Sequence, residues 1–170
     1  MDEDHKEIGL TFSEIKDGMS KEQLKKKIED KDTKDWKEEL NNKTSLKIYR
    51  EWKRTIKEET FYDNRPSSVV LFKCRTNNLE LNDRNKFMNQ DTRCKLCEET
   101  NEDLAHYLLH CPAYNEIRSK IPEFQQPYIE NENELIGKYL FTSKNIKKVK
   151  DNMYKFWKTR TKKLKEQDSE

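Results

Sequence analysis

The sequence predicts an all-α fold, a small multi-helix domain with a basic helix at its C-terminus. Apolar residues recur at three- and four-residue spacing along several segments, which is the period of an amphipathic helix. Serine, asparagine or proline stands where such segments begin, as expected of helix starts. The 170-residue chain has three glycines and four prolines, so few positions interrupt a helix. With 32% hydrophobic and 40% charged residues, the core is expected to be small.

The first helix is predicted to follow Ser20, which can form a capping box with Gln23. We expect this helix to break near Asp32 and Thr33 and a second short helix to follow. The two asparagines at 41–42 then interrupt the helical pattern.

Thr44 or Ser45 can cap the next helix, whose inward side chains repeat at helical spacing. Those side chains are Leu46, Tyr49, Trp52 and Ile56. The segment 69–74, VVLFKC, is β-prone by composition. Residues 65–68 precede it, and they end the previous helix and supply an N-cap for a new one. We therefore predict a helix there too.

Five further helices are predicted after residue 81. Asn82 can cap a short helix that ends near Phe87, and a helix with Leu104, Tyr107 and Leu108 facing inward is expected over 102–110. Pro112 can open a short helix that runs to Ile117. Residues 132–141 and 143–166 form the last two helices, the latter with an inward face of Ile146, Val149, Met153, Phe156, Trp157, Arg160 and Leu164.

A metal-ligand pattern lies in the middle of the chain, Cys94-x2-Cys97-x8-His106-x4-Cys111. A C-x2-C turn places two thiolates on one side of a tight loop, and a later histidine and cysteine complete a tetrahedron. The pattern predicts one structural Zn²⁺ with four protein ligands and no open position. His110 is the alternative histidine, but it is the immediate neighbour of Cys111, so His106 is favoured. Cys74 is expected to be a small buried side chain.

The segment 67–114 resembles the zinc-binding region that lies C-terminal to the reverse transcriptase in non-LTR retrotransposon polyproteins, especially those of jockey-like elements. The resemblance extends over residues 45–120, and more loosely to the segments LIGKYLF and FWKTR. The matching features are Arg75-Thr76 with Leu81, the cysteine pair, and a run of the form E-x-x-H-x-L-x-x-C-P followed by an aromatic residue. The residues that roughly match this run are Glu102, His106, Leu109, Cys111, Pro112 and Tyr114, with Glu102 one residue from the commonest position of the glutamate in the family.

The resemblance implies a zinc-bearing accessory module that holds template RNA or target DNA. It does not imply catalysis in this chain, which has no Asp-Asp pair of the polymerase type and no carboxylate set of an RNase H or endonuclease. The closed ligand set and the lack of a nucleophile–base arrangement also predict that the protein is not an enzyme.

Charge is distributed unevenly and points to the same kind of ligand. Residues 141–165 hold ten Lys and Arg and one Asp, net +9, with Tyr154, Phe156 and Trp157 among them. Lysines neutralise phosphates and aromatic rings stack on bases, so nucleic acid, RNA or DNA, is the predicted partner. The candidate contacts are Arg50, Lys53, Arg54, Lys57, Lys150, Lys155, Lys158, Arg160, Lys162 and Lys163.

The alternative is a protein–protein interaction module in which zinc is purely structural. The acidic region 76–136, net −6, would repel phosphate and favours this hypothesis. The sequence predicts an acidic, weakly ordered lead-in over 1–19, a helical zinc-binding domain over 20–141 and a basic helix and tail over 142–170. No apolar run is long enough to cross a membrane and no signal peptide is visible, so we expect an intracellular, nuclear or cytoplasmic protein without a small-molecule substrate.

Overall fold

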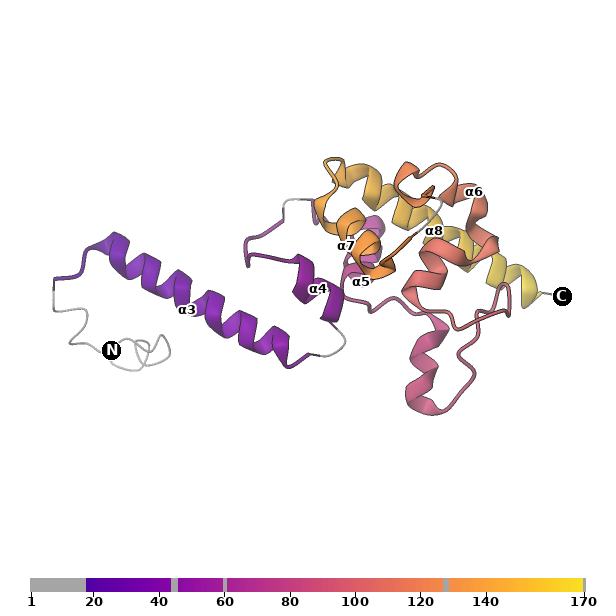
Figure 1. The fold of residues 1–170 in the computed structure, drawn as a ribbon, viewed down its shortest axis with the longest axis horizontal. Coiled ribbons are helices and arrows are strands. Elements are labelled where there is room, and N and C mark those ends of the chain that lie inside the picture. The colour runs from indigo at the N-terminus through magenta and orange to yellow at the C-terminus, as the bar shows by residue number, and fades with distance from the viewer. Residues whose placement is uncertain (1–17, 44–45, 60, 127–128, 170) are drawn as a thin grey trace. The chain divides into compact units, whose positions relative to one another are not determined.

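The computed structural model describes residues 18–43, 46–59, 61–126 and 129–169, most of which are helical (Figure 1). The prediction of an all-α fold is confirmed, since the described residues contain an isolated β-bridge between Arg93 and Asn101 but no strand. The chain divides into two compact units, residues 1–43 and 44–170. This division differs from the boundaries predicted at residues 19 and 141, and most of the predicted lead-in, with His5, lies outside the described residues.

The described part of the first unit is one helix, α3, Lys21–Asn41. Its capping box is confirmed, because Ser20 Oγ accepts from the Gln23 backbone and Gln23 Oε1 accepts from the Ser20 backbone. The predicted break near residues 32–33 is wrong, since the helix continues through it. Lysine–glutamate pairs four residues apart support the helix on both sides, Lys25 with Glu29 and Lys34 with Glu38.

The second unit begins with α4, Lys47–Trp52, which is shorter than predicted. Ile56 lies beyond its end and is largely exposed, while the candidate caps Thr44 and Ser45 lie outside the described residues. Helix α5, Pro66–Arg75, confirms the helix predicted over the β-prone VVLFKC segment. Proline at the first helical position favours the helix start, and burial of one face outweighs the weak β-propensity.

Short helical segments form the middle of this unit. They are a 3₁₀ helix over Asn82–Met88, a π-helical turn over His106–His110, a 3₁₀ turn over Pro112–Tyr114, α6 over Asn115–Arg118 and a 3₁₀ turn over Pro122–Phe124. The helices predicted after Asn82, Glu102 and Pro112 are therefore present, but mostly as tighter or wider turns than an α-helix.

Two longer helices complete the second unit, α7 over Glu132–Thr142 and α8 over Ile146–Gln167 (Figure 1). Helix α8 packs against α5, α6 and α7, and Val149, Met153 and Phe156 from its predicted inward face are buried. Phe156 joins Tyr107 and Tyr114 in an aromatic cluster with ring centroids 4.9 to 5.6 Å apart. The basic C-terminal helix is thus part of the core.

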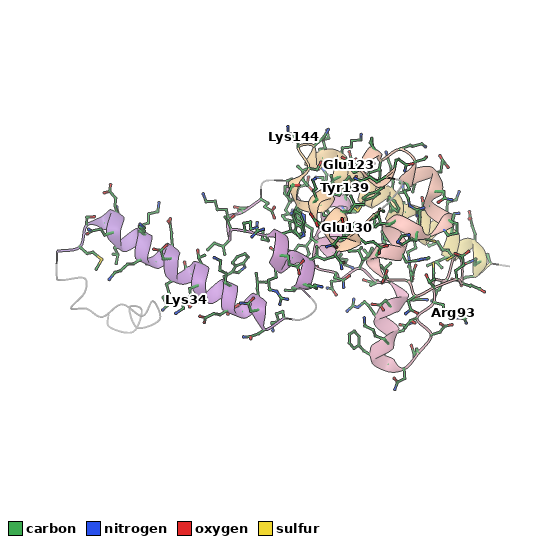
Figure 2. All side chains as sticks on the ribbon, viewed as in Figure 1. Lys34, Arg93, Glu123, Glu130, Tyr139 and Lys144 are labelled. Atoms are coloured by element: carbon green, nitrogen blue, oxygen red, sulfur yellow. The ribbon has the colours of Figure 1, made fainter. Side chains whose placement is uncertain are left out.

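Buried arginine and glycine positions show how tightly the helices pack. Arg75 donates through Nε and Nη2 to the Leu140 carbonyl near the end of α7, at 3.0 and 2.6 Å. A Cβ atom added to Gly137 of α7 would lie 2.0 Å from Trp52 Nε1, so only glycine permits this approach of α4 to α7. Tyr139 of α7 is buried, whereas Lys144, between α7 and α8, is exposed; both are labelled in Figure 2.

None of the helices in the described ranges combines the length and the apolar content that a bilayer-spanning helix needs.

Candidate metal centre

A short loop presents the first two cysteines. The Cys94 backbone N–H donates to the Thr100 carbonyl at 2.8 Å, and the Glu98 N–H donates back to the Cys94 carbonyl at 2.8 Å. Glu98 adopts the left-handed conformation, with φ of 59°, which reverses the chain directly after Cys97. The loop is therefore closed by backbone hydrogen bonds that leave both thiols on its inner side.

The π-helical turn presents the other two side chains. Five residues along an α-helix rotate a side chain by about 500°, which would leave His106 and Cys111 on different faces. In the structure the Cys111 N–H donates to the His106 carbonyl, five residues earlier, at 2.8 Å. This wider turn places Cys111 on the same side of the helix as His106, so the imidazole and the thiol converge.

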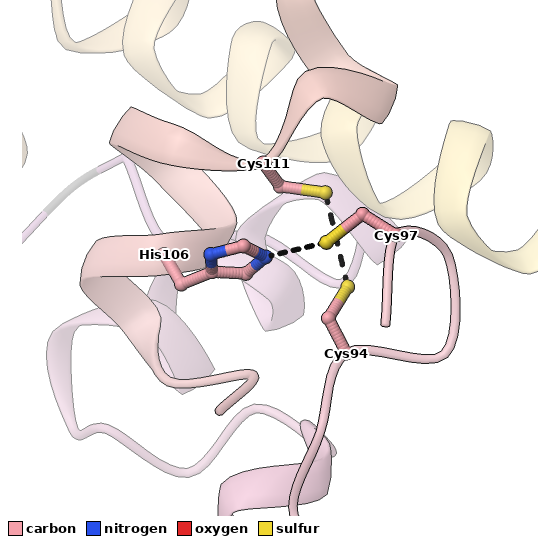
Figure 3. A group of neighbouring side chains, drawn as sticks. All are labelled: Cys94, Cys97, His106 and Cys111. Carbon is pink, nitrogen blue, oxygen red and sulfur yellow. Dashed lines mark hydrogen bonds between the residues drawn. The ribbon is translucent and has the colours of Figure 1, made fainter. Parts of the chain in front are cut away.

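The four side chains meet at one point (Figure 3). Their ligand atoms all lie within 4.8 Å of one another, and no other group of three or more Cys, His, Asp or Glu among the described residues is placed to hold a metal ion. Cys94 Sγ lies 3.8 Å from Cys111 Sγ, and Cys97 Sγ lies 3.3 Å from His106 Nε2. The predicted set of Cys94, Cys97, His106 and Cys111 is thus assembled and could bind a metal ion.

The imidazole is held so that Nε2 faces the thiols. His106 Nδ1 lies 2.9 Å from Thr100 Oγ1, and the His106 backbone N–H donates to Asp103 Oδ1 at 2.7 Å. A second partner for the non-ligating ring nitrogen fixes the tautomer in metal-binding histidines. Thr100 fills that role here, because its hydroxyl oxygen can accept the Nδ1 proton.

One of the buried thiols is already prepared for deprotonation. The hydrogen bond from Cys111, assisted by the backbone N–H groups of Leu96 and Cys97, lowers the pKa of the Cys94 thiol to about 5. The same bond raises the pKa of Cys111 far above its usual range, because Cys111 keeps the proton. A divalent cation would displace that proton, so metal binding is expected to release protons.

Glu102 connects this site to α8. Its carboxylate is fully buried and accepts from Arg160 Nε at 2.8 Å and Arg160 Nη2 at 2.7 Å. It also accepts from the Asn82 backbone N–H at 2.9 Å and lies 4.0 Å from Cys94 Sγ. Arg118 is a second buried cation, and its Nη2 donates to the Cys111 carbonyl at 2.6 Å. These two arginines hold the segments that carry the thiols.

The remaining candidate ligands lie apart from the cluster. His110 is exposed, and its Nε2 lies 2.6 Å from Glu132 Oε1 at the start of α7. Cys74 is fully buried on α5, and burial raises the pKa of its thiol to about 12. The interpretation of Cys74 as a small core side chain is confirmed.

The structure separates the predicted nucleic-acid contacts into two groups. Lys150 is buried and pairs with Asp63 at 3.1 Å, Arg160 pairs with Glu102, and Lys53 is mostly buried and pairs with Glu59 at 3.0 Å. These three cations are held by carboxylates within the unit, which corrects their assignment to a phosphate-binding surface. The exposed candidates are Arg54, Lys57, Lys155, Lys158, Lys162 and Lys163, while Arg50 is half-buried.

Sequence reasoning did not identify the structural roles of Glu102, Arg118 and Arg160. Two features of the sequence could have indicated the buried pair. Glu102 begins the run that contains His106 and Cys111, and Arg160 falls on the predicted inward face of α8. Comparison with protein-family models finds no match for this chain, and comparisons with curated proteins and with solved structures find none either.

Proposed function

We propose that this protein is a non-catalytic, zinc-stabilised helical module that binds RNA or DNA through the exposed lysines of α8. The observation that carries the proposal is the outward face of that helix. Lys148, Lys155, Lys158, Lys162 and Lys165 follow one another at intervals of three, four or seven residues, and all are exposed. This spacing aligns them along one side of the helix.

Most of these lysines are available to an external anion. Among the described residues, Lys148, Lys155, Lys158 and Lys165 form no ion pair, and Lys162 lies 3.6 Å from Glu166. Because α8 is fixed by its buried face, the lysines are displayed on a rigid rod about 25 Å long from 148 to 165. A row of unpaired cations on a rigid support favours the binding of a phosphate backbone.

Zinc is the metal that the ligand set favours. A tetrahedral Zn²⁺ with Zn–S bonds of about 2.3 Å separates two sulfurs by about 3.8 Å and a sulfur from a nitrogen by about 3.5 Å. The Cys94–Cys111 and Cys97–His106 separations, 3.8 and 3.3 Å, fit those edges. Three thiolates and one imidazole also match the donor preference of this ion.

The role proposed for the ion is structural. Four protein ligands fill a tetrahedral shell and leave no position for water or substrate, as in zinc sites that stabilise small folds. Two of the ligands come from the closed loop and two from the π-helical turn, so the ion would join segments with little other secondary structure. Descent from a retrotransposon polyprotein is part of the proposal and is supported by the sequence run around these ligands.

A protein partner is the second candidate, favoured by one feature of α5. Val69 and Phe72 are three residues apart on this helix and are 50% and 46% exposed. Phe72 borders a cavity of about 380 Å³ together with Leu46, Tyr49 and Thr76. An exposed apolar surface of this kind is common at protein interfaces.

Nucleic-acid binding is tested by titrating 15-nucleotide RNA, 15-nucleotide DNA and a matched duplex at several salt concentrations. The variant K155Q/K158Q/K165Q is compared with K21Q/K26Q/K37Q, which removes the same charge from exposed sites on α3. We expect only the α8 variant to weaken binding and to lower the salt dependence by about two to three ions. Absence of binding at low salt, or equal binding by both variants, would contradict the proposal.

A further inference from the structure

The 3₁₀ helix Asn82–Met88 ends in two large side chains that the fold does not cover. Phe87 is 82% exposed and Met88 is 62% exposed, the highest values among the large hydrophobic residues described. Exposed apolar side chains of this size often mark a binding surface when they occur on an ordered segment. We call Arg84 and Phe87 the knob.

The backbone of the knob is fixed by hydrogen bonds. The Asn82 N–H donates to Glu102 Oε2 at 2.9 Å and Asn82 Nδ2 donates to the Arg93 carbonyl at 2.8 Å. At the far end Asn89 is left-handed, with φ of 52°, and Asn85 Nδ2 donates to the Asp91 carbonyl at 2.9 Å. The backbone that carries Phe87 is therefore ordered before binding, which lowers the ordering cost of binding.

A free cation lies on the same face as this ring. Side chains three residues apart eclipse in a 3₁₀ helix, and the 2.7 Å pair between Lys86 and Asp83 shows that they meet here. Arg84 and Phe87 have the same spacing and are both exposed. Within the described ranges the Arg84 guanidinium forms no hydrogen bond or ion pair. Arg84 and Phe87 thus lie on one side of the helix, and Lys86 Nζ approaches the same ring, 5.3 Å from its centroid.

The segment that carries the knob and the end of α8 border one groove. A groove of about 750 Å³ is bordered by Asn82, Asn85 and Gln90 from the loop and by Gln167 and Asp168 from the end of α8. Lys165 precedes those last two residues on the helix. The groove is also lined by two acidic and two basic side chains, Asp91, Glu98, Arg93 and Lys95. Its amide side chains can donate to and accept from base edges.

We propose that Phe87 stacks on an unpaired base of the bound strand while Arg84 contacts a neighbouring phosphate. This inference rests on the proposed function and names its ligand class, single-stranded RNA or DNA. A base inside a duplex has both faces covered by its neighbours, whereas an unpaired base offers a free π-face to an aromatic ring. The combination of an exposed ring on an ordered backbone and an exposed guanidinium fits this ligand.

The test compares F87A and M88A, which truncate neighbouring exposed side chains and are expected to leave the thermal midpoint unchanged. Binding to a 15-nucleotide single strand and to a blunt 15-base-pair duplex is measured by fluorescence anisotropy. We expect F87A to weaken single-strand binding by at least about fivefold and duplex binding by less than about twofold. M88A and F87W should stay within about twofold of the unchanged protein on both ligands.

The outcomes separate this inference from the proposed function. If the unchanged protein binds neither ligand, the proposed function fails. If it binds single strands and F87A binds them equally well, the stacking role is overturned and the α8 surface remains. Binding to the duplex alone would also overturn the role of Phe87, and an effect of F87A confined to a protein partner would assign the knob to that partner instead.

Discussion

Arg160 of α8 reaches the fully buried carboxylate of Glu102 with two hydrogen bonds, Nε to Oε1 at 2.8 Å and Nη2 to Oε2 at 2.7 Å. Glu102 follows the cysteine loop in the chain and lies 4.0 Å from Cys94 Sγ. The pair therefore ties the basic helix to the metal centre, with both charges removed from water. Removing one partner from such a pair leaves an uncompensated charge in the interior.

We predict that R160M lowers the free energy of unfolding by about 3–5 kcal/mol, because it leaves the Glu102 carboxylate buried without its cation. R160M/E102Q should recover part of that loss, since the amide is neutral and still accepts from Asn82. The measurement is urea unfolding of the metal-loaded protein, with the exposed-site variant K158M as control. If R160M is no less stable than K158M, the buried pair does not have this role.

A backbone prediction concerns the reversal after Cys97. Glu98 has φ of 59°, a conformation that costs a residue with a Cβ atom about 1 kcal/mol relative to glycine. We therefore expect E98G to leave stability unchanged or raise it by up to about 1 kcal/mol. E99G, at the next exposed residue, should lower stability by about 0.5–1 kcal/mol because it only adds freedom to the unfolded chain. Equal effects of the two substitutions in thermal unfolding would be inconsistent with this geometry.

Gly137 provides a test of the packing between α4 and α7. Since an added Cβ would meet Trp52 Nε1 at 2.0 Å, G137A should destabilise the second unit by about 1–3 kcal/mol, despite the higher helix propensity of alanine. In the double variant W52L/G137A the smaller leucine side chain leaves room for the added methyl group. We expect G137A to lower the stability less in the W52L background than in the unchanged protein. An equal loss of stability in both backgrounds would rule out the predicted clash.

Acid stability should depend on Asp63. The Ser68 hydroxyl, the Arg65 backbone N–H and the Lys150 ammonium lower the pKa of the Asp63 carboxyl from 3.8 to about 2. A depressed folded-state pKa stabilises the protein above the unfolded value, and this contribution is lost as pH falls from about 4 towards 2. D63N should therefore be less stable at pH 7 and lose less stability than the unchanged protein over that interval. Parallel unfolding curves of the two proteins against pH would argue against this linkage.

The fold was predictable from sequence where a local rule decides the outcome. Ser20 and Gln23 each accept a hydrogen bond from the backbone of the other at the start of α3. Pro66 begins α5 in spite of the β-branched residues that follow. The metal-ligand set was predictable for a similar reason, because the C-x2-C spacing alone places two thiols on one side of a loop.

The remaining features depend on contacts between distant residues. The sequence places Arg160 and Lys150 among the residues of a basic surface. In the structure Arg160 pairs with Glu102, 58 positions earlier, and Lys150 pairs with Asp63, 87 positions earlier. The π-helical turn cannot be read from residues 106–110, because only the convergence of His106 and Cys111 shows its use. Asp32 and Thr33 suggested a break that the flanking ion pairs of α3 compensate.

The metal centre is tested by the metal content of the purified protein, together with its helical content before and after chelation. We predict one Zn²⁺ per chain, bound by Cys94, Cys97, His106 and Cys111, and loss of cooperative unfolding when a chelator removes it. C97S should lower the metal content in the same way, whereas C74S, which changes a buried cysteine outside the cluster, should retain it. A protein that carries no stoichiometric metal and unfolds identically with and without chelator would contradict a structural zinc site.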